Sequence, residues 1–176
     1  MLNIPKKRAA ALAAVLAPVL LMTFAASAQA SDKIVWRNKA TGGCIRVYNN
    51  AQIDTDAGAK VHCQNVGIFN GKHFDSSWND SQDRLENPNG SYKITTNNTY
   101  FSGYCLASWY PDSNGLGRVY IEGCSSPANY YQQWEERWTG DGMKLVNRQT
   151  GMCLDSNRQG SVYTHSCNGG NYQVWK

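Results

Sequence analysis

The stretch CLDSNRQGSVYTHSCNGGNYQVW, residues 153–175, decides the fold class of this chain. It holds in order a cysteine, a leucine, an acid, a glycine turn, an alternating run, a second cysteine, a glycine-rich turn and a Gln-x-Trp ending. In the alternating run, Val162 and Thr164 take turns with Tyr163 and His165, which is the period of a short half-buried strand. Each feature is common alone, and their order makes the signature specific.

Two looser copies of this stretch precede it. All three share the pattern Asn/Thr-x-x-Thr/Ser-Gly-x-Cys, which is typical of a turn that delivers a cysteine into a strand. The copies are residues 38–44 (NKATGGC), 99–105 (TYFSGYC) and 147–153 (NRQTGMC). Internal repetition is therefore the main organising feature of the sequence.

The second half of the unit repeats as well. Residues 118–124 (RVYIEGC) match 161–167 (SVYTHSC) column by column, and residues 59–63 (AKVHC) form a weaker copy. A tryptophan closes each unit, at positions 78, 134 and 175. The pattern predicts three units, over about 33–88, 89–140 and 141–176.

The fold class follows from what lies between these motifs. No segment after residue 30 keeps a helical apolar period over three turns, and short alternating runs are separated by Gly, Asn, Asp and Ser. This indicates an all-β domain of three units with about four short strands each. Because no unit can bury its own apolar face, the three should share one core, with linkers at 79–91 and 139–142.

Residues 1–30 have the features of a cleaved signal peptide. Lys6, Lys7 and Arg8 precede an apolar run, and residues 28–30 read A-Q-A, an A-x-A cleavage site. We expect a mature chain of 31–176 that forms a single domain in an oxidising, extracellular compartment. No other apolar run is long enough to span a bilayer.

Net charge argues against nucleic acid as a partner. The sequence has 17 basic and 13 acidic residues, and three basic residues lie in the expected signal peptide, which leaves 14 against 13, or +1. No run of Lys and Arg is present that would follow a phosphate backbone.

Six cysteines lie in the expected mature chain, at positions 44, 63, 105, 124, 153 and 167. Six cysteines allow fifteen pairings, but the spacings of 19, 19 and 14 favour one disulfide within each unit. On the chain-entropy model each such loop contributes about 3 kcal/mol. A zinc site is the weaker alternative because no C-x-x-C pair occurs. We expect no metal and no cofactor.

The Cys-Leu-x and Gln-x-Trp units resemble the ricin B-chain type β-trefoil lectin domain, also called carbohydrate-binding module family 13, in a bacterial secreted form. The resemblance covers nearly all of the expected mature chain. It is strong in the third unit, moderate in the second and weak in the first, where residues 74–78 (FDSSW) replace Gln-x-Trp. It implies a β-trefoil with pseudo-threefold symmetry and up to three shallow sugar pockets.

A pyranose needs a flat ring against its C–H face and fixed hydrogen-bonding groups for its hydroxyls, of which a carboxylate is the strongest acceptor. The resemblance places such a site in the third unit. Its candidate residues are Asp155, Tyr163, His165, Asn171, Tyr172 and Gln173. An imidazole stands where the family has Trp or Tyr, and Tyr172 stands in the asparagine column.

The other two units lack the matching columns. The second has Ala107 for the acid and Glu122 for the ring, and the first has Arg46 and Val61. We therefore expect one competent sugar site. Asp155 could instead terminate a turn, His165 could be an idle exposed histidine, and Gln173 could brace the acid as well as touch sugar.

Trp109 and Tyr110 form a second candidate contact surface, ahead of a turn at residues 112–115 (DSNG). Exposed rings of this kind favour contact with a glycan or a protein. The alternative is that the loop folds its own aromatic side chains back onto the barrel.

Catalysis has little support in the sequence. No G-x-S-x-G or H-E-x-x-H motif occurs, and adjacent Glu135 and Glu136 on a strand would face opposite sides. We expect a secreted lectin that binds a galactose-like or other neutral sugar. The alternative is a non-catalytic subunit, adaptor or inhibitor that binds a secreted protein partner through a trefoil scaffold.

Overall fold

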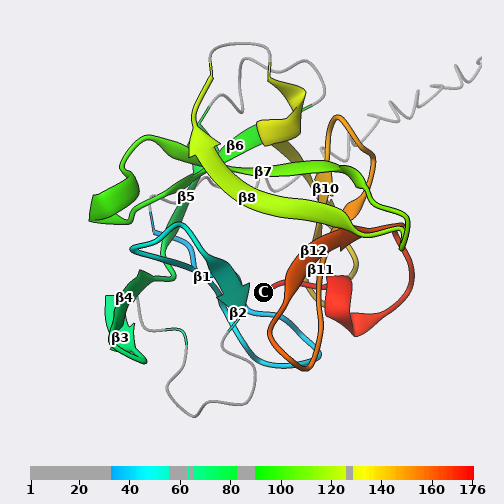
Figure 1. The fold of residues 1–176 in the computed structure, drawn as a ribbon. Helices are drawn as coiled ribbons and strands as arrows, with labels where there is room; N and C mark the ends of the chain where they lie inside the picture. Colours follow the sequence, from blue (N-terminus) through cyan, green and yellow to red (C-terminus); the bar gives the residue numbers. More distant parts are fainter. Residues whose placement is uncertain (1–32, 56–62, 64–65, 83–89, 126–128) are drawn as a thin grey trace, which may run out of the picture.

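The structure is a computed structural model that describes residues 33–55, 63, 66–82, 90–125 and 129–176. The expected signal peptide lies outside these residues. Half of the described residues are in strands and 7% are in helices, so the prediction of an all-β trefoil is confirmed. Figure 1 shows the three repeats arranged around a common centre.

Each repeat contributes a similar set of short strands. The first holds β1 (Ile45–Tyr48), β2 (Ile53–Thr55), β3 (Val66–Phe69), β4 (Lys72–Asp75) and β5 (Trp78–Gln82). The second holds β6 (Tyr92–Thr96), β7 (Tyr104–Pro111), β8 (Gly117–Gly123) and β9 (Gln133–Trp138). The third holds β10 (Met143–Asn147), β11 (Cys153–Ser156) and β12 (Val162–His165). Short 3-10 helices lie at η1 (Thr99–Phe101), η2 (Tyr130–Gln132) and η3 (Asn171–Gln173).

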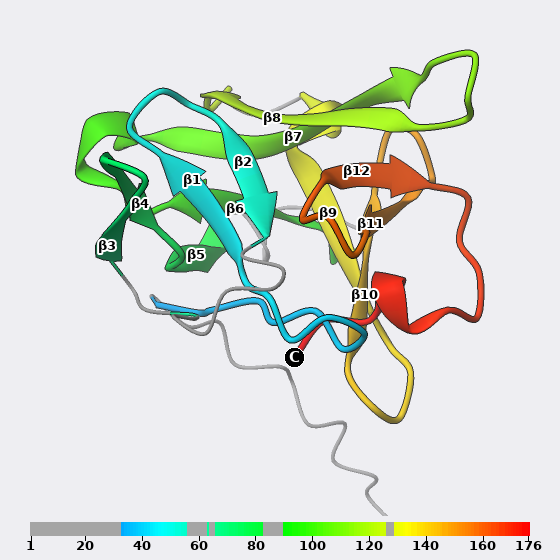
Figure 2. The ribbon, with the colours of Figure 1, turned by 60° about the horizontal axis from the view of Figure 1, so that its bottom comes forward.

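Antiparallel pairing joins the repeats into a closed structure. One sheet has the order β5-β6-β7-β8-β12-β11-β10-β9, and an added β6–β9 pairing closes most of it into a ring. The second sheet, β2-β1-β4-β3, belongs to the first repeat. Trp175 extends the ring through bridges to Asn38 and Met143, so the end of the chain joins its beginning. Figure 2 shows the C-terminus beside this first segment.

The core depends on the tryptophan that ends each repeat. The indole N–H groups of Trp78, Trp134 and Trp175 donate to the carbonyl of the residue after each repeat's first cysteine, at 3.1, 2.9 and 3.1 Å. All three side chains are fully buried. Each repeat thus closes on itself with the same bond. Trp36 is a fourth buried core tryptophan, and its indole N–H has no hydrogen-bond partner.

Asparagines at the repeat junctions hold neighbouring repeats together. The amide of Asn147 donates to the carbonyl of Tyr131 at 2.8 Å, and that of Asn38 donates to Tyr172 at 2.7 Å. In the middle repeat the sequence pattern put Thr99 in this column, but Asn98 takes the role. Its side-chain oxygen accepts from the next turn at 2.8 Å while its amide donates to a carbonyl of the first repeat. The shorter threonine side chain, with a single hydroxyl, would not span both of these partners.

Three disulfides join the cysteines within each repeat, as the spacings predict. The pairs are Cys44–Cys63, Cys105–Cys124 and Cys153–Cys167, with Cα–Cα separations of 5.2, 5.0 and 5.0 Å.

Two details of the first repeat were not predicted as they stand. Strand β1 pairs with β2, with Arg46 opposite Asp54. Residues 59–62, most of the weaker copy at 59–63, lie outside the described part. The expected linker 79–91 is wrong at its start, since residues 79–82 belong to β5, which pairs with β6. The linker expected at 139–142 is the tight turn between β9 and β10.

The indole-to-carbonyl bond can be tested by comparing two buried tryptophans. Trp175→Phe removes a hydrogen-bond donor and leaves a buried carbonyl, whereas Trp36→Phe removes a donor that has no partner. We expect Trp175→Phe to lower the free energy of unfolding by about 1–2 kcal/mol more than Trp36→Phe, measured by urea denaturation. Equal losses would show that the bond makes no net contribution.

Candidate functional site

Asp155 lies at the centre of the third repeat, on β11, and is 5% exposed. Its Oδ2 accepts a hydrogen bond from the Gln173 side-chain amide at 2.8 Å. The same amide donates to the Ser166 carbonyl at 3.0 Å, and its oxygen accepts from the Asn168 N–H at 2.8 Å. Gln173 is therefore fully engaged in joining η3 to β11 and to the loop after the third disulfide. This supports its expected bracing role.

The other carboxylate oxygen of Asp155 has a different environment. Oδ1 is buried and has no hydrogen-bond partner. Burial raises the pKa of the Asp155 carboxyl above 3.8, and the lowering effects of the Gln173 amide, the backbone N–H of Ser156 and the nearby His165 do not offset it. Oδ1 is thus a desolvated acceptor without a well-formed hydrogen bond from the described residues, which is costly in the free protein.

A cavity of about 340 Å³ opens above Asp155. It is lined by Asp155, Ser156, Asn157, Arg158, Gln159, Tyr163, Asn168, Gly170 and Tyr172. The loop from β11 to β12 has a defined shape because the Asn157 side-chain oxygen accepts from the N–H groups of Gln159 and Ser161, both at 3.0 Å. The cavity combines two tyrosine rings with several polar groups, a composition that suits a small polar ligand.

The structure brings some of the sequence-predicted residues together and separates others. Asp155, Tyr163 and Tyr172 line the cavity, and Gln173 lies behind it in contact with the acid. His165 is half-buried on β12, opposite Cys153 in the strand register, and is not among the lining residues. Exposed Asn171 also lies outside the lining.

Sequence reasoning missed the residues that line the cavity from loops. They are Ser156, Asn157, Arg158, Gln159, Asn168 and Gly170. The Asn-x-x-Gly pattern at residues 157–160 is the one signal that could have indicated an ordered turn beside the acid.

The second repeat carries an acid at the equivalent place, but from another strand. Gln132 corresponds to Gln173, and its amide donates to the Glu122 carboxylate and to the Gly123 carbonyl, both at 2.9 Å. Ala107 occupies the column of Asp155 and is fully buried. The prediction that this column has lost its acid holds. The sequence comparison missed that Glu122, on β8, presents a carboxylate to the same glutamine.

Trp109 and Tyr110 lie beside η2 as part of an aromatic cluster. The rings of Trp109 and Tyr131 are stacked, with centroids 4.4 Å apart, and Tyr110 meets Tyr131 edge-on at 5.7 Å. The Tyr110 hydroxyl accepts from Gln149 at 2.9 Å. The loop does pack against the body of the molecule, yet Trp109 and Tyr110 remain 50% and 48% exposed.

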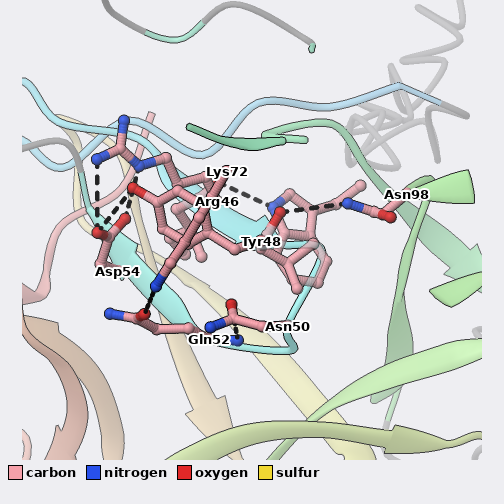
Figure 3. A network of polar contacts seen from close by, with 10 residues as sticks. Arg46, Tyr48, Asn50, Gln52, Asp54, Lys72 and Asn98 are labelled. Atoms are coloured by element: carbon pink, nitrogen blue, oxygen red, sulfur yellow. Dashed lines mark hydrogen bonds and ion pairs between the residues drawn. The ribbon is translucent and has the colours of Figure 1, made fainter. Parts of the chain in front are cut away.

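In the first repeat the pocket position is occupied by an internal ion pair (Figure 3). Arg46, in the acid column, donates from Nε to Asp54 at 2.6 Å, and the Tyr48 hydroxyl also bonds to Asp54 at 3.1 Å. The guanidinium lies 5.2 and 5.0 Å from the ring centroids of Tyr48 and Phe74. Asp54 is therefore committed to groups of the chain. Val61, the ring candidate, lies outside the described residues.

A further cavity of about 350 Å³ lies between the β3–β4 hairpin and η1. Its carboxylate, Asp75, is bonded through Oδ1 to the N–H and hydroxyl of Ser77, both at 2.7 Å. We favour the cavity over Asp155 because Asp155 lies in the column where the family resemblance places the sugar-binding acid. In the described residues no group of three or more His, Cys, Asp and Glu could hold a metal ion. The same residues include no helix long and apolar enough to cross a membrane.

The sequence model of the ricin-type β-trefoil lectin domain matches residues 32–175. The chain belongs to this family.

Solved structures agree with the family assignment at the level of the fold. A designed threefold symmetric protein, ThreeFoil, has a TM-score of 0.56 at 22% identity, covering 83% of this chain and 97% of that one. SeviL bound to asialo-GM1 saccharide has a TM-score of 0.54 at 14% identity, covering 82% and 94%. A GlcNAcα1-4Gal releasing endo-β-galactosidase from Clostridium perfringens gives 0.58 at 17%, covering 83% of this chain and 32% of the enzyme. Membership of the lectin-domain family supports carbohydrate binding in general.

The raised pKa of Asp155 predicts how stability changes with pH. Because the folded pKa lies above the unfolded one, the folded chain takes up a proton first as pH falls toward 3.8. We expect the wild type to gain unfolding free energy relative to Asp155→Asn, which cannot titrate, between pH 7 and pH 4. Chemical denaturation of both proteins at each pH measures this difference. A difference that is constant with pH, or that changes in the opposite direction, would contradict the raised pKa.

Proposed function

We propose that this chain is a secreted, non-catalytic lectin that binds a pyranose through the cavity over Asp155 in the third repeat. The observation that carries the proposal is the buried, unpaired Oδ1 of Asp155 in a lectin-family fold. A sugar hydroxyl that enters the cavity would donate to the carboxylate of Asp155, which lines it, and hydrogen bonds to an ionised acceptor are stronger than neutral ones. Two neighbouring hydroxyls of a galactose-like sugar could both donate to this carboxylate.

The aromatic side chains of the cavity support the same proposal. Tyr163 is held by its hydroxyl, which donates to the Ser156 carbonyl at 3.2 Å, and Tyr172 lies in η3 at the other side. Their rings offer apolar surface to the C–H face of a pyranose. Tyrosine also loses little conformational entropy on binding, which matters for a site with weak affinity.

Non-catalytic function is supported by the carboxylates of the cavity. Asp155 is the only acid among its lining residues, whereas glycoside hydrolysis typically needs a pair. Secretion is supported by three disulfides, which persist in oxidising compartments, and by residues 1–30, which we propose are a cleaved signal peptide. We expect millimolar affinity, about 4 kcal/mol per site, that becomes useful through multivalent display.

Asp155→Asn tests the site while keeping the bond to Gln173, because an amide oxygen can still accept from it. We expect saccharide binding, first detected on a glycan array and then measured by saturation-transfer NMR, to fall at least tenfold. Asp112→Asn is the matched control, since it makes the same chemical change at an exposed turn of the second repeat. Wild-type binding by the Asp155 variant would remove the third-repeat site from the proposal.

The aromatic cluster of the second repeat supports a second contact surface. Trp109 is already stacked on Tyr131, so its ring is held in place while half of it stays exposed. Such a preorganised ring can cover a sugar face or anchor a secreted protein partner. The adaptor function remains the second candidate on this ground.

We expect Trp109→Ala to reduce retention of either a glycan or a protein partner by about tenfold while the Asp155 site keeps its affinity. Trp138→Ala is the control because Trp138 is also exposed, at 71%, on another part of the surface. Pull-down from culture supernatant and the glycan array distinguish the two kinds of partner. Equal retention by wild type and the Trp109 variant in both assays would exclude a role for this surface.

A further inference from the structure

Arg158 gives the third-repeat cavity a positive charge that the sequence analysis did not predict. It is an exposed residue of the β11–β12 loop and one of the nine that line the cavity. Its Nε donates to the Tyr172 hydroxyl at 3.0 Å, which holds the guanidinium at the cavity edge. Within the described part of the chain no carboxylate lies in ion-pair distance of Arg158.

Other cations in or beside this repeat have partners away from the cavity. Lys39 pairs with Asp141 at 2.6 Å, and Lys176 lies 4.0 Å from the same carboxylate. Arg148 donates to the Gln133 side chain and lies over the Tyr130 ring, with 3.9 Å to its centroid. Arg158 therefore differs from them in facing a cavity without an anionic partner.

The charge of the whole repeat has the same sign. Residues 141–176 carry four basic and two acidic residues, a net of +2, against three and four, a net of −1, for residues 89–140. A second cation, Lys144, donates to the carbonyl of Asn168, which is itself a lining residue. An anion that approaches this cavity meets a favourable local field.

We infer that the sugar bound over Asp155 carries a negative charge, as a uronic acid or a sulfate ester, and that Arg158 recognises it. The inference rests on the proposed lectin function and specifies its ligand class. Hydroxyls of the ring would bond to Asp155 at the floor, while the carboxylate or sulfate would pair with the guanidinium at the edge. Arginine suits this role because its planar fork matches either anion in a bidentate way.

Neutral and acidic versions of the same sugar test the effect of the ligand's charge. The probes are galactose with galacturonate, glucose with glucuronate, and N-acetylgalactosamine with its 6-sulfate, titrated by saturation-transfer NMR. We expect at least one acidic member to bind about three- to tenfold more tightly than its neutral partner at low salt, and the preference to shrink in 1 M NaCl. The uronate and sulfate arms distinguish the two sources of charge.

Two arginine variants complete the test. Arg158→Gln should abolish the preference, so that each acidic sugar binds no more tightly than its neutral partner. Arg137→Gln, the same change at an exposed arginine paired with Glu135, should keep the preference. Equal binding within every sugar pair, or a preference that survives Arg158→Gln, overturns the inference while the lectin proposal stands. If no sugar of either kind binds the wild type, the lectin proposal itself fails.

Discussion

The hydrogen bond from the closing tryptophan of each repeat to the carbonyl after its first cysteine is the constraint on which the rest of the structure depends. It joins the last strand of a repeat to its middle hairpin, inside a core that is fully buried. Since an indole N–H buried without a partner is costly, this bond favours one position of each closing tryptophan. In the third repeat this places Trp175, and hence Gln173 two residues before it. Gln173 in turn places the Asp155 carboxylate. The binding cavity is thus built outward from the core.

The three repeats share this tryptophan-to-carbonyl bond and differ in the charged residue at the position of the pocket acid. The third leaves one carboxylate oxygen of Asp155 unpaired. In the first repeat, Arg46 replaces the acid and is neutralised across the strand pair by Asp54. In the second, the carboxylate moves to Glu122 on the neighbouring strand and still meets the conserved bracing amide of Gln132. The first repeat pairs opposite charges, whereas the second and third hold a carboxylate with a neutral glutamine amide.

Much of the fold could be predicted because its determinants are local and repeated. Cysteine spacing gave the disulfides, and the turn pattern gave the three repeats, since both depend on neighbouring residues. The site was harder because it depends on which residues face each other across strands. Asp54 was not matched to Arg46, because their pairing depends on the register of β1 against β2, which the repeat columns do not show. Arg158 was missed because its place at the cavity is set by a contact with Tyr172, fourteen residues away.

The unpaired oxygen of Asp155 also implies a conflict between stability and binding. At neutral pH the ionised carboxylate is desolvated by the fold, which costs folding free energy, as the direction of its pKa shift shows. A neutral residue at this position would relieve that cost, as Ala107 does in the second repeat. Retaining a buried acid with a free oxygen is therefore difficult to explain by packing alone. A bound hydroxyl would return the lost hydrogen bond, so the same atom that weakens the free protein would stabilise the complex.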